Sequence, residues 1–103
     1  MYKGKTIAVV VPCYNEETQI GGVITNMPAI VDKVIVVNDK STDNTSQVIR
    51  SMVHDGGKVV LVEHEKNQGV GGAIASGYIW CRDNGIDVAV VMAGDGQMNP
   101  DDL

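Results

Sequence analysis

The fold is decided by residues 6–11, which read Thr6-Ile7-Ala8-Val9-Val10-Val11 and form an unbroken, mostly β-branched apolar run. Such a run is typical of a strand buried on both faces, as in a parallel sheet that is covered by helices. Similar runs at residues 34–37, 59–62 and 87–92 each predict a further strand. The 103-residue chain therefore carries strand signals at regular intervals from one end to the other.

Helical patterns fill the intervals between these runs. Asn15 is expected to cap the first helix, and Pro28 falls where that helix should end. The polar residues 41–44 precede a second helix, and a glycine-rich turn at residues 69–72 opens a third. The expected inward positions of the three helices recur at helical spacing: Ile20, Val23, Ile24 and Met27; Thr45, Val48, Ile49 and Met52; Ile74, Gly77, Tyr78 and Cys81.

Strands and helices that alternate in this way predict an α/β fold with a Rossmann-like parallel sheet, four strands alternating with three helices. We expect residues 1–103 to form a single domain. In such sheets ligands bind beyond the carboxyl ends of the strands. The polar clusters of this chain all follow strand ends, so a binding site is expected along that edge.

Composition narrows the classes of function. Hydrophobic residues make up 44% and charged residues 20%, as in a folded globular domain. The formal net charge is −5 and no block of Lys or Arg occurs, which argues against nucleic acid as a partner. No apolar run approaches the roughly 20 residues of a membrane-spanning helix. Without a secretion signal or a disulfide framework, we expect a cytoplasmic setting.

Several common sites are missing from the sequence. The turn after the first expected strand contains no glycine, which disfavours the G-x-G-x-x-G dinucleotide site, and no P-loop motif is present. The histidines His54 and His64 have no partner at metal-ligand spacing and are expected to be surface or structural residues. Cys13 has no histidine at readable spacing, so a thiol nucleophile is not expected.

Four polar clusters follow the four expected strands. They read Pro12-Cys13-Tyr14-Asn15-Glu16, Asn38-Asp39-Lys40-Ser41-Thr42-Asp43, Asn67-Gln68-Gly69-Val70-Gly71-Gly72-Ala73 and Ala93-Gly94-Asp95-Gly96-Gln97. In this order and spacing they resemble the family 2 glycosyltransferases of GT-A fold, and most of all the dolichol- and polyprenyl-phosphate sugar synthases. The resemblance implies that the chain is the nucleotide-sugar-binding half of such an enzyme.

The resemblance also implies roles for individual residues. The turn with Pro12, Tyr14, Asn15 and Glu16 would cradle the base and ribose, and Asp39 would read the base. The loop with Asn67, Gly69 and Gly71 would bring its backbone close to the nucleotide sugar. Asn38 stands where the family usually has the first acid of a pair. The alternative is that Asp39, Ser41 and Asp43 are only turn and cap residues, which is the interpretation we favour for Asp43.

A divalent cation is the cofactor that the resemblance implies. The family's Asp-x-Asp metal motif appears as Ala93-Gly94-Asp95, so its first acid is absent. Asp95 is expected to bind the nucleotide diphosphate through Mg²⁺ or Mn²⁺, with Gln97 as a second oxygen ligand. The alternative is an ordinary turn after the fourth strand.

The expected activity is transfer of a sugar from a UDP- or GDP-sugar to an acceptor such as a polyprenyl phosphate. Residues 99–102 look like a helix start, so we expect a truncated chain whose general base lies beyond Leu103 and which is inactive alone. A homo-oligomer is also expected, and peripheral membrane association for the full-length protein. Two alternatives remain open: a catalytically inactive nucleotide-binding module, and a nucleotidyltransferase, although the glycine-free turn after the first strand disfavours the latter.

Overall fold

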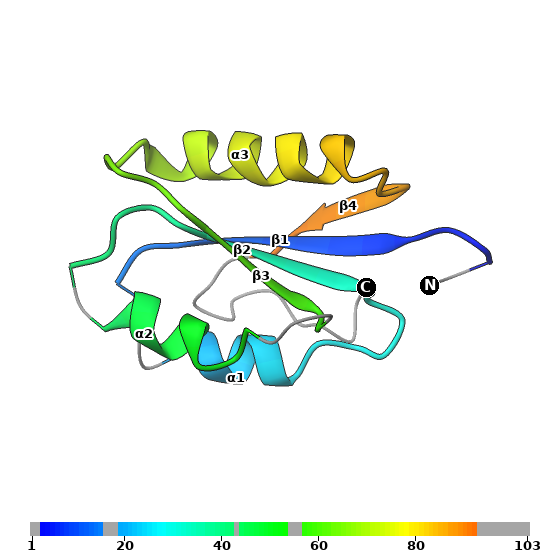
Figure 1. Cartoon of the computed structure of the whole chain (residues 1–103), viewed down its shortest axis with the longest axis horizontal. Helices are drawn as coiled ribbons and strands as arrows, with labels where there is room; N and C mark the ends of the chain where they lie inside the picture. Colours follow the sequence, from blue (N-terminus) through cyan, green and yellow to red (C-terminus); the bar gives the residue numbers. More distant parts are fainter. Residues whose placement is uncertain (1–2, 16–18, 43, 54–56, 93–103) are drawn as a thin grey trace.

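The computed structural model describes residues 3–15, 19–42, 44–53 and 57–92. Strands and helices alternate along these residues, as the sequence predicts (Figure 1). The elements are β1 (Ile7–Cys13), α1 (Ile20–Thr25), β2 (Lys33–Asn38), α2 (Thr45–Arg50), β3 (Val59–Glu63), α3 (Gly69–Asp83) and β4 (Val88–Val91).

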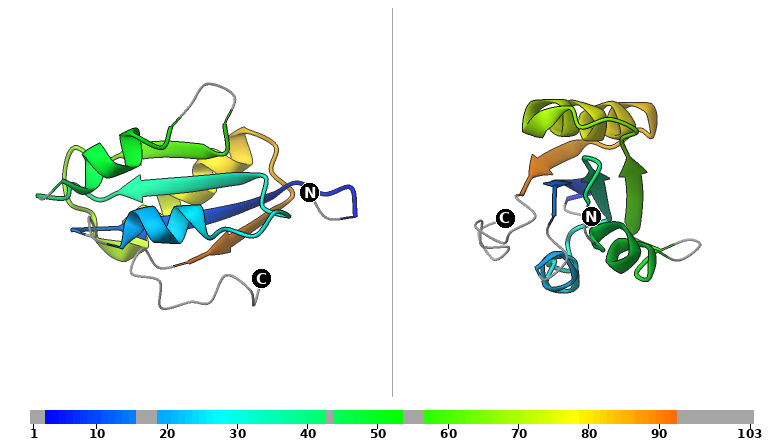
Figure 2. Two further views of the ribbon diagram at one scale, coloured as in Figure 1. Left: turned by 90° about the horizontal axis from the view of Figure 1, so that it is seen from below. Right: turned by 90° about the vertical axis from the view of Figure 1, so that its left-hand side faces the viewer.

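The four strands form one parallel sheet in the order β3-β2-β1-β4. Helix α3 covers one face of the sheet, and α1 and α2 lie on the other (Figures 1 and 2). This three-layer arrangement confirms the predicted α/β fold. Strand β1 lies inside the sheet between β2 and β4, which explains why its sequence is apolar without interruption.

Side chains of β1 alternate between two cores. Val9 and Val11 are fully buried on the side of α1 and α2, where Ile20 and Ile49 also pack. Ala8 and Val10 are fully buried on the other side, against α3. Because a strand turns successive side chains to opposite faces, one apolar run supplies both cores.

Helix α3 approaches the sheet very closely at Gly77. A Cβ atom at this position would lie 2.3 Å from Cγ1 of Val10, so only a glycine fits without a shift. Ala73 and Cys81 are the other buried residues of the helix. The prediction that Tyr78 also faces inward is wrong, because this residue is 44% exposed. The buried residues of α3 are Ala73, Gly77 and Cys81, which are four positions apart, and Tyr78 lies outside this row.

The predicted cap of the first helix is also wrong. Helix α1 begins at Ile20 after Gln19, and Asn15 instead accepts a hydrogen bond at Oδ1 from the backbone N–H of Thr42 (2.7 Å). The backbone of Asn15 is left-handed (φ 55°), a conformation that asparagine adopts more readily than most residues. Its side chain therefore joins the loop after β1 to the loop after β2.

Cys13 and Cys81 are both buried, and burial raises the pKa of the Cys81 thiol. No helix within the described parts of the chain has the length and apolar character needed to cross a membrane.

Candidate functional site

The carboxyl ends of β1, β2 and β3 lie side by side. Cys13 pairs with Asn38, and Asn38 pairs with Glu63. The ladder continues one residue further, since the N–H of Asp39 donates to the carbonyl of Cys13 and the N–H of His64 donates to that of Asn38, both at 3.0 Å. Loops that are distant in sequence thus meet at one edge of the sheet, as expected for a ligand site of a parallel sheet.

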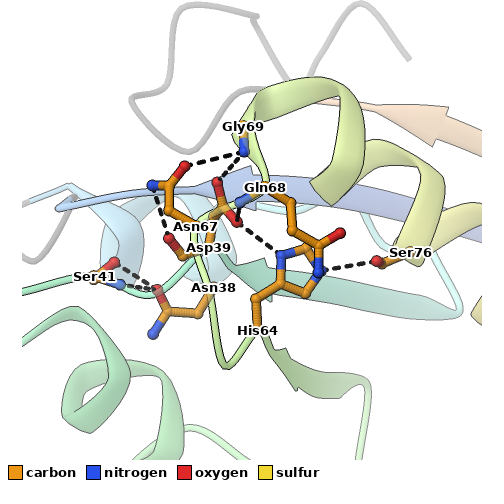
Figure 3. Close-up of polar contacts among 8 residues, drawn as sticks. All are labelled: Asn38, Asp39, Ser41, His64, Asn67, Gln68, Gly69 and Ser76. Atoms are coloured by element: carbon orange, nitrogen blue, oxygen red, sulfur yellow. Dashed lines mark hydrogen bonds and ion pairs between the residues drawn. The ribbon is translucent and has the colours of Figure 1, made fainter.

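Asp39 is the centre of this edge (Figure 3). Its side chain is 5% exposed, and its carboxylate accepts three hydrogen bonds. Oδ1 accepts from the N–H of Gln68 at 2.7 Å and from Nδ1 of His64 at 2.7 Å, and Oδ2 accepts from the N–H of Gly69 at 2.8 Å. Asp39 therefore holds the first residues of α3 against the end of β2.

The environment of Asp39 stabilises its ionised form. Burial by itself raises the pKa of this carboxyl group, but the hydrogen bonds from Gln68, His64 and Gly69 outweigh burial and lower its pKa below the ordinary value. Because an ionised carboxylate can only accept, Nδ1 of His64 must carry a proton.

His64 connects Asp39 to the body of α3. Its side chain is 6% exposed, and its second ring nitrogen, Nε2, lies 2.8 Å from Oγ of Ser76 (Figure 3). In the neutral ring Nε2 accepts the hydroxyl proton of Ser76. The chain Asp39–His64–Ser76 therefore fixes the direction of the Asp39 carboxylate from two elements at once.

Asn67 and Gly69 shape the turn before α3. Nδ2 of Asn67 donates to the carbonyl of Asp39 at 3.2 Å, and its Oδ1 accepts from the N–H of Gly69 at 3.1 Å. Gly69 has a φ of 79°, which a side chain would oppose. The backbone conformation of Gly69 therefore favours glycine at this position, independently of the predicted role near a ligand.

A second network joins the loops after β1 and β2. Oδ1 of Asn38 accepts from the N–H and the hydroxyl of Ser41, and Oγ of Ser41 accepts from the N–H of Asn15 at 3.0 Å. Lys40, between Asn38 and Ser41, is left-handed (φ 58°). Ser41 is thus a turn residue, as the alternative interpretation held, and it also holds the neighbouring loop.

The structure brings most of the predicted site residues to this edge. Tyr14 is 45% exposed there, Pro12 is partly buried in β1, and Gly71 is exposed in the first turn of α3. Asp39 and Asn67 are linked directly, and Asn15 contacts Ser41 and Thr42 in the loop after β2. Glu16, Asp43, Asp95 and Gln97 lie outside the described residues.

Among the described residues, no group of three or more His, Cys, Asp or Glu side chains is arranged to hold a metal ion. The predicted metal residues follow β4 in sequence. The N–H of Met92, just after that strand, donates to the carbonyl of Val10 at 2.9 Å, so β4 ends beside β1 at the same edge of the sheet. The donor set at Asp95 and Gln97 stays a prediction.

His64 is the residue whose importance the sequence did not predict. It was expected to be a surface or structural residue because no metal-ligand partner lies near it in sequence. The missed signal is positional: His64 follows β3 directly, as Asp39 follows β2, and these strands are neighbours. Strand order, which the sequence leaves open, is what brings the two side chains together.

Comparison with known proteins decides the family. The model of "Glycosyl transferase family 2" matches residues 8–103. This chain belongs to glycosyltransferase family 2. The resemblance of its four strand-end clusters to that family is therefore confirmed.

Curated relatives of this family 2 chain include polyprenyl-phosphate sugar transferases. It is 35% identical to UDP-N-acetylglucosamine–dolichyl-phosphate N-acetylglucosaminyltransferase of Methanococcus voltae, over 96% of this chain and 45% of the relative. It is 28% identical to undecaprenyl-phosphate mannosyltransferase of Micrococcus luteus, over 94% of this chain and 41% of the relative. The family 2 chain thus spans less than half the length of these relatives.

Solved structures with the same fold hold nucleotides and manganese. A mannosyltransferase of Pyrobaculum calidifontis in complex with GDP-mannose and Mn²⁺ superimposes with a TM-score of 0.72 at 26% identity, over 86% of this chain and 27% of that one. Glucosyl-3-phosphoglycerate synthase of Mycobacterium tuberculosis with Mn²⁺, UDP and glucosyl-3-phosphoglycerate gives a TM-score of 0.65 at 28% identity, over 88% and 34%. The GT-A type of this family 2 fold is confirmed.

Proposed function

We propose that this chain forms the donor-binding part of an enzyme that transfers a sugar from a UDP- or GDP-sugar to an acceptor such as a polyprenyl phosphate. The observation that carries the proposal is the meeting of Tyr14, Asp39, Asn67 and Gly69 at the carboxyl edge of the sheet. This is the edge at which α/β sheets bind their ligands. The relatives from Methanococcus and Micrococcus support the acceptor class.

We assign individual roles as follows. The exposed residue Tyr14, with Pro12 and Asn15, would contact the base and ribose, together with Glu16, which lies outside the described residues. Asp39, at the end of the neighbouring strand β2, would offer an acceptor to a base N–H. Gly69 and Gly71 expose backbone at the start of α3, so this loop can approach the sugar diphosphate closely.

The diphosphate of the donor carries negative charge, and the described residues at the carboxyl edge of the sheet do not neutralise all of it. The N–H groups of Gln68 and Gly69, at the start of α3, already donate to Asp39 and are unavailable to a phosphate. We therefore assign the diphosphate to a divalent cation, Mg²⁺ or Mn²⁺, at Asp95 with Gln97. Such a cation neutralises charge on the departing nucleoside diphosphate. The Mn²⁺ complexes of the structural relatives support this assignment.

The isolated chain is expected to bind donor but to transfer little or no sugar. Inverting transfer needs a general base or an ionised acceptor. Because the chain corresponds to 45% of the Methanococcus relative, we assign the base and the acceptor site to parts of such an enzyme that these 103 residues do not include. The acceptor class also suggests a full-length enzyme that works at the cytoplasmic surface of a membrane.

Calorimetric titration tests the proposal. The chain is titrated with UDP and with GDP, each with and without Mn²⁺, and the titrations are repeated on Asp95→Ala. We expect nucleotide binding that Mn²⁺ strengthens at least tenfold in the parent chain and not in the variant. Failure of both nucleotides to bind under all conditions would refute a donor site in this chain, while equal binding with and without Mn²⁺ would favour the metal-independent nucleotide-binding module.

A further inference from the structure

The carboxylate of Asp39 has almost no free acceptor capacity. A carboxylate offers about four acceptor positions, two on each oxygen. Oδ1 already accepts from Gln68 and His64, and Oδ2 accepts from Gly69. Within the described parts of the chain, these are the donors to Asp39, so a single acceptor position remains, and it is on Oδ2.

Bases differ in what they require of a carboxylate. Guanine presents two adjacent donors, N1–H and the 2-amino group, which pair best with the two oxygens of one carboxylate. Uracil presents a single N3–H donor between two carbonyl oxygens. Cytosine has an acceptor at N3 and its donor on the neighbouring 4-amino group, so a carboxylate placed to accept from the N3–H of uracil would face the N3 lone pair of cytosine. A carboxylate with one free position on one oxygen matches uracil, whereas the second donor of guanine would meet an oxygen that is already saturated.

We propose that His64 is a specificity-determining residue: by occupying Oδ1 of Asp39, it limits this carboxylate to one acceptor and selects uracil over guanine. The inference rests on the proposed function, because it requires that Asp39 faces the base of the donor. It makes a UDP-sugar the donor class.

His64 suits this role because it cannot turn away. The ring is buried, and Ser76 holds its far nitrogen at 2.8 Å. The two backbone donors to Asp39 belong to the start of α3 and would be present with any side chain at position 64. Among the donors to Asp39, His64 is therefore the one that a change of side chain can remove.

The first test uses the parent chain alone. Affinities for UDP, GDP and CDP are measured by calorimetry with Mn²⁺ present. We expect UDP to bind at least about tenfold more tightly than GDP and CDP, the ratio typical of one well-placed base contact. A chain that binds GDP or CDP as tightly as UDP overturns the inference but leaves the donor site intact, whereas a chain that binds none of the three refutes the donor site itself.

The second test removes the donor at Oδ1. In His64→Ala the UDP:GDP affinity ratio should fall to within about threefold, because Oδ1 regains an acceptor position. His64→Asn is the matched rescue: its Nδ2 can occupy the place of the histidine Nδ1, so the UDP preference should persist. Ser76→Ala removes only the far contact and should also retain the preference.

The ratio separates specificity from a general structural effect. If His64 only supports the fold, His64→Ala weakens UDP and GDP equally and leaves their ratio unchanged, which overturns the inference. Circular dichroism and thermal melting of each variant establish that it is folded. Should His64→Ala fail to fold, two measurements still test the inference. The first is the parent chain's affinity series for UDP, GDP and CDP. The second is the UDP:GDP ratio of His64→Asn, since loss of the UDP preference in this variant contradicts the role of Nδ1.

Discussion

Asn38 is the last residue of β2, and its surroundings favour an amide side chain over a carboxylate at this position. Asn38 is 3% exposed, and its Oδ1 accepts from Ser41. The hydroxyl of Ser46 and the guanidinium of Arg50, followed by the amide of Asn38, hold the pKa of Glu63 below its ordinary value. An acid at position 38 would place a second carboxylate beside Glu63.

Asn38→Asp should therefore destabilise the fold by about 1 kcal/mol at neutral pH. The loss arises from repulsion between two carboxylates, so it should shrink as pH falls towards about 4, where carboxylates protonate. Chemical denaturation at pH 7 and pH 4 measures both values. Adding Glu63→Gln removes the repulsion and should restore stability at pH 7, and a loss that is equal at both pH values would contradict this explanation.

Asp39 should make the stability of the fold depend on pH. Its pKa is lower in the folded chain than the ordinary value of 3.8, so its contribution is fully present above that value and is lost as pH falls through the folded pKa. Asp39→Asn should cost about 1–3 kcal/mol at pH 7, because buried N–H groups lose a charged acceptor.

Urea denaturation at several pH values tests this linkage. Between pH 5 and pH 3 the parent chain should lose more stability than Asp39→Asn, which has no carboxyl group to protonate at this position. Asp32 and Asp87, whose pKa values are also lowered, by hydrogen bonds at the opposite end of the sheet, remain in both chains and serve as a common background. Identical pH profiles would show that Asp39 is not linked to folding.

At the scale of the element, the position of α3 on the sheet depends on one glycine. Gly77→Ala would place a Cβ 2.3 Å from the Val10 side chain, which is fully buried and stiff at χ1. We expect a loss of about 1–3 kcal/mol in the free energy of unfolding, typical of an overpacked core. Thermal or urea denaturation provides the measurement.

Gly71→Ala is the matched control for this prediction, since no atom lies within 4 Å of its added Cβ in the same helix. Its stability should be unchanged or higher by about 0.5–1 kcal/mol, as expected of alanine in a helix. Val10→Ala should partly rescue Gly77→Ala by making room for the new methyl group. Equal effects of the two glycine substitutions would mean that helix propensity, rather than contact with Val10, controls this position.

At the scale of the whole molecule, β4 forms the edge of the described sheet next to β1. Its first residue, Val88, is 38% exposed, and apolar edge strands promote association. We predict that the chain forms a dimer or larger assembly as concentration rises, which light scattering with size separation would detect. A monomer at all concentrations would contradict the prediction.

Val88→Lys should weaken this association about tenfold or more, because a charge on an edge strand opposes pairing. Val53→Lys is a suitable control, since Val53 is equally exposed at 39% but lies after α2, away from β4. Equal effects of the two substitutions would indicate a nonspecific gain in solubility rather than pairing through β4.

Much of this architecture is readable from short-range patterns. The four apolar runs predicted the strands, and the alternation of runs with helical spacing predicted a parallel sheet with its site at the carboxyl edge. Strand ends differ by one or two residues: β1 continues to Cys13, and β4 begins at Val88 rather than Asp87. Family membership was readable too, because the four clusters keep their order and spacing along the chain.

The site itself was only partly predictable. Asp39, Asn67 and Gly69 were named from their motifs, and the structure brings them together. The partnership of Asp39 with His64 was not predicted, and Asn15 was assigned to the wrong contact. Tyr78 was placed inward because spacing alone cannot decide which stripe of a helix with few charges faces the sheet.

The sequence by itself determined which segments are strands and helices, because those choices depend on neighbouring residues and on the alternation of apolar side chains. Only the tertiary structure decided which strand ends are neighbours, that Gly77 rather than Tyr78 meets the sheet, and that His64 binds Asp39. These contacts join residues far apart in sequence, such as Val10 and Gly77, which are 67 positions apart, so they depend on strand order and on close packing between layers. No local pattern carries that information.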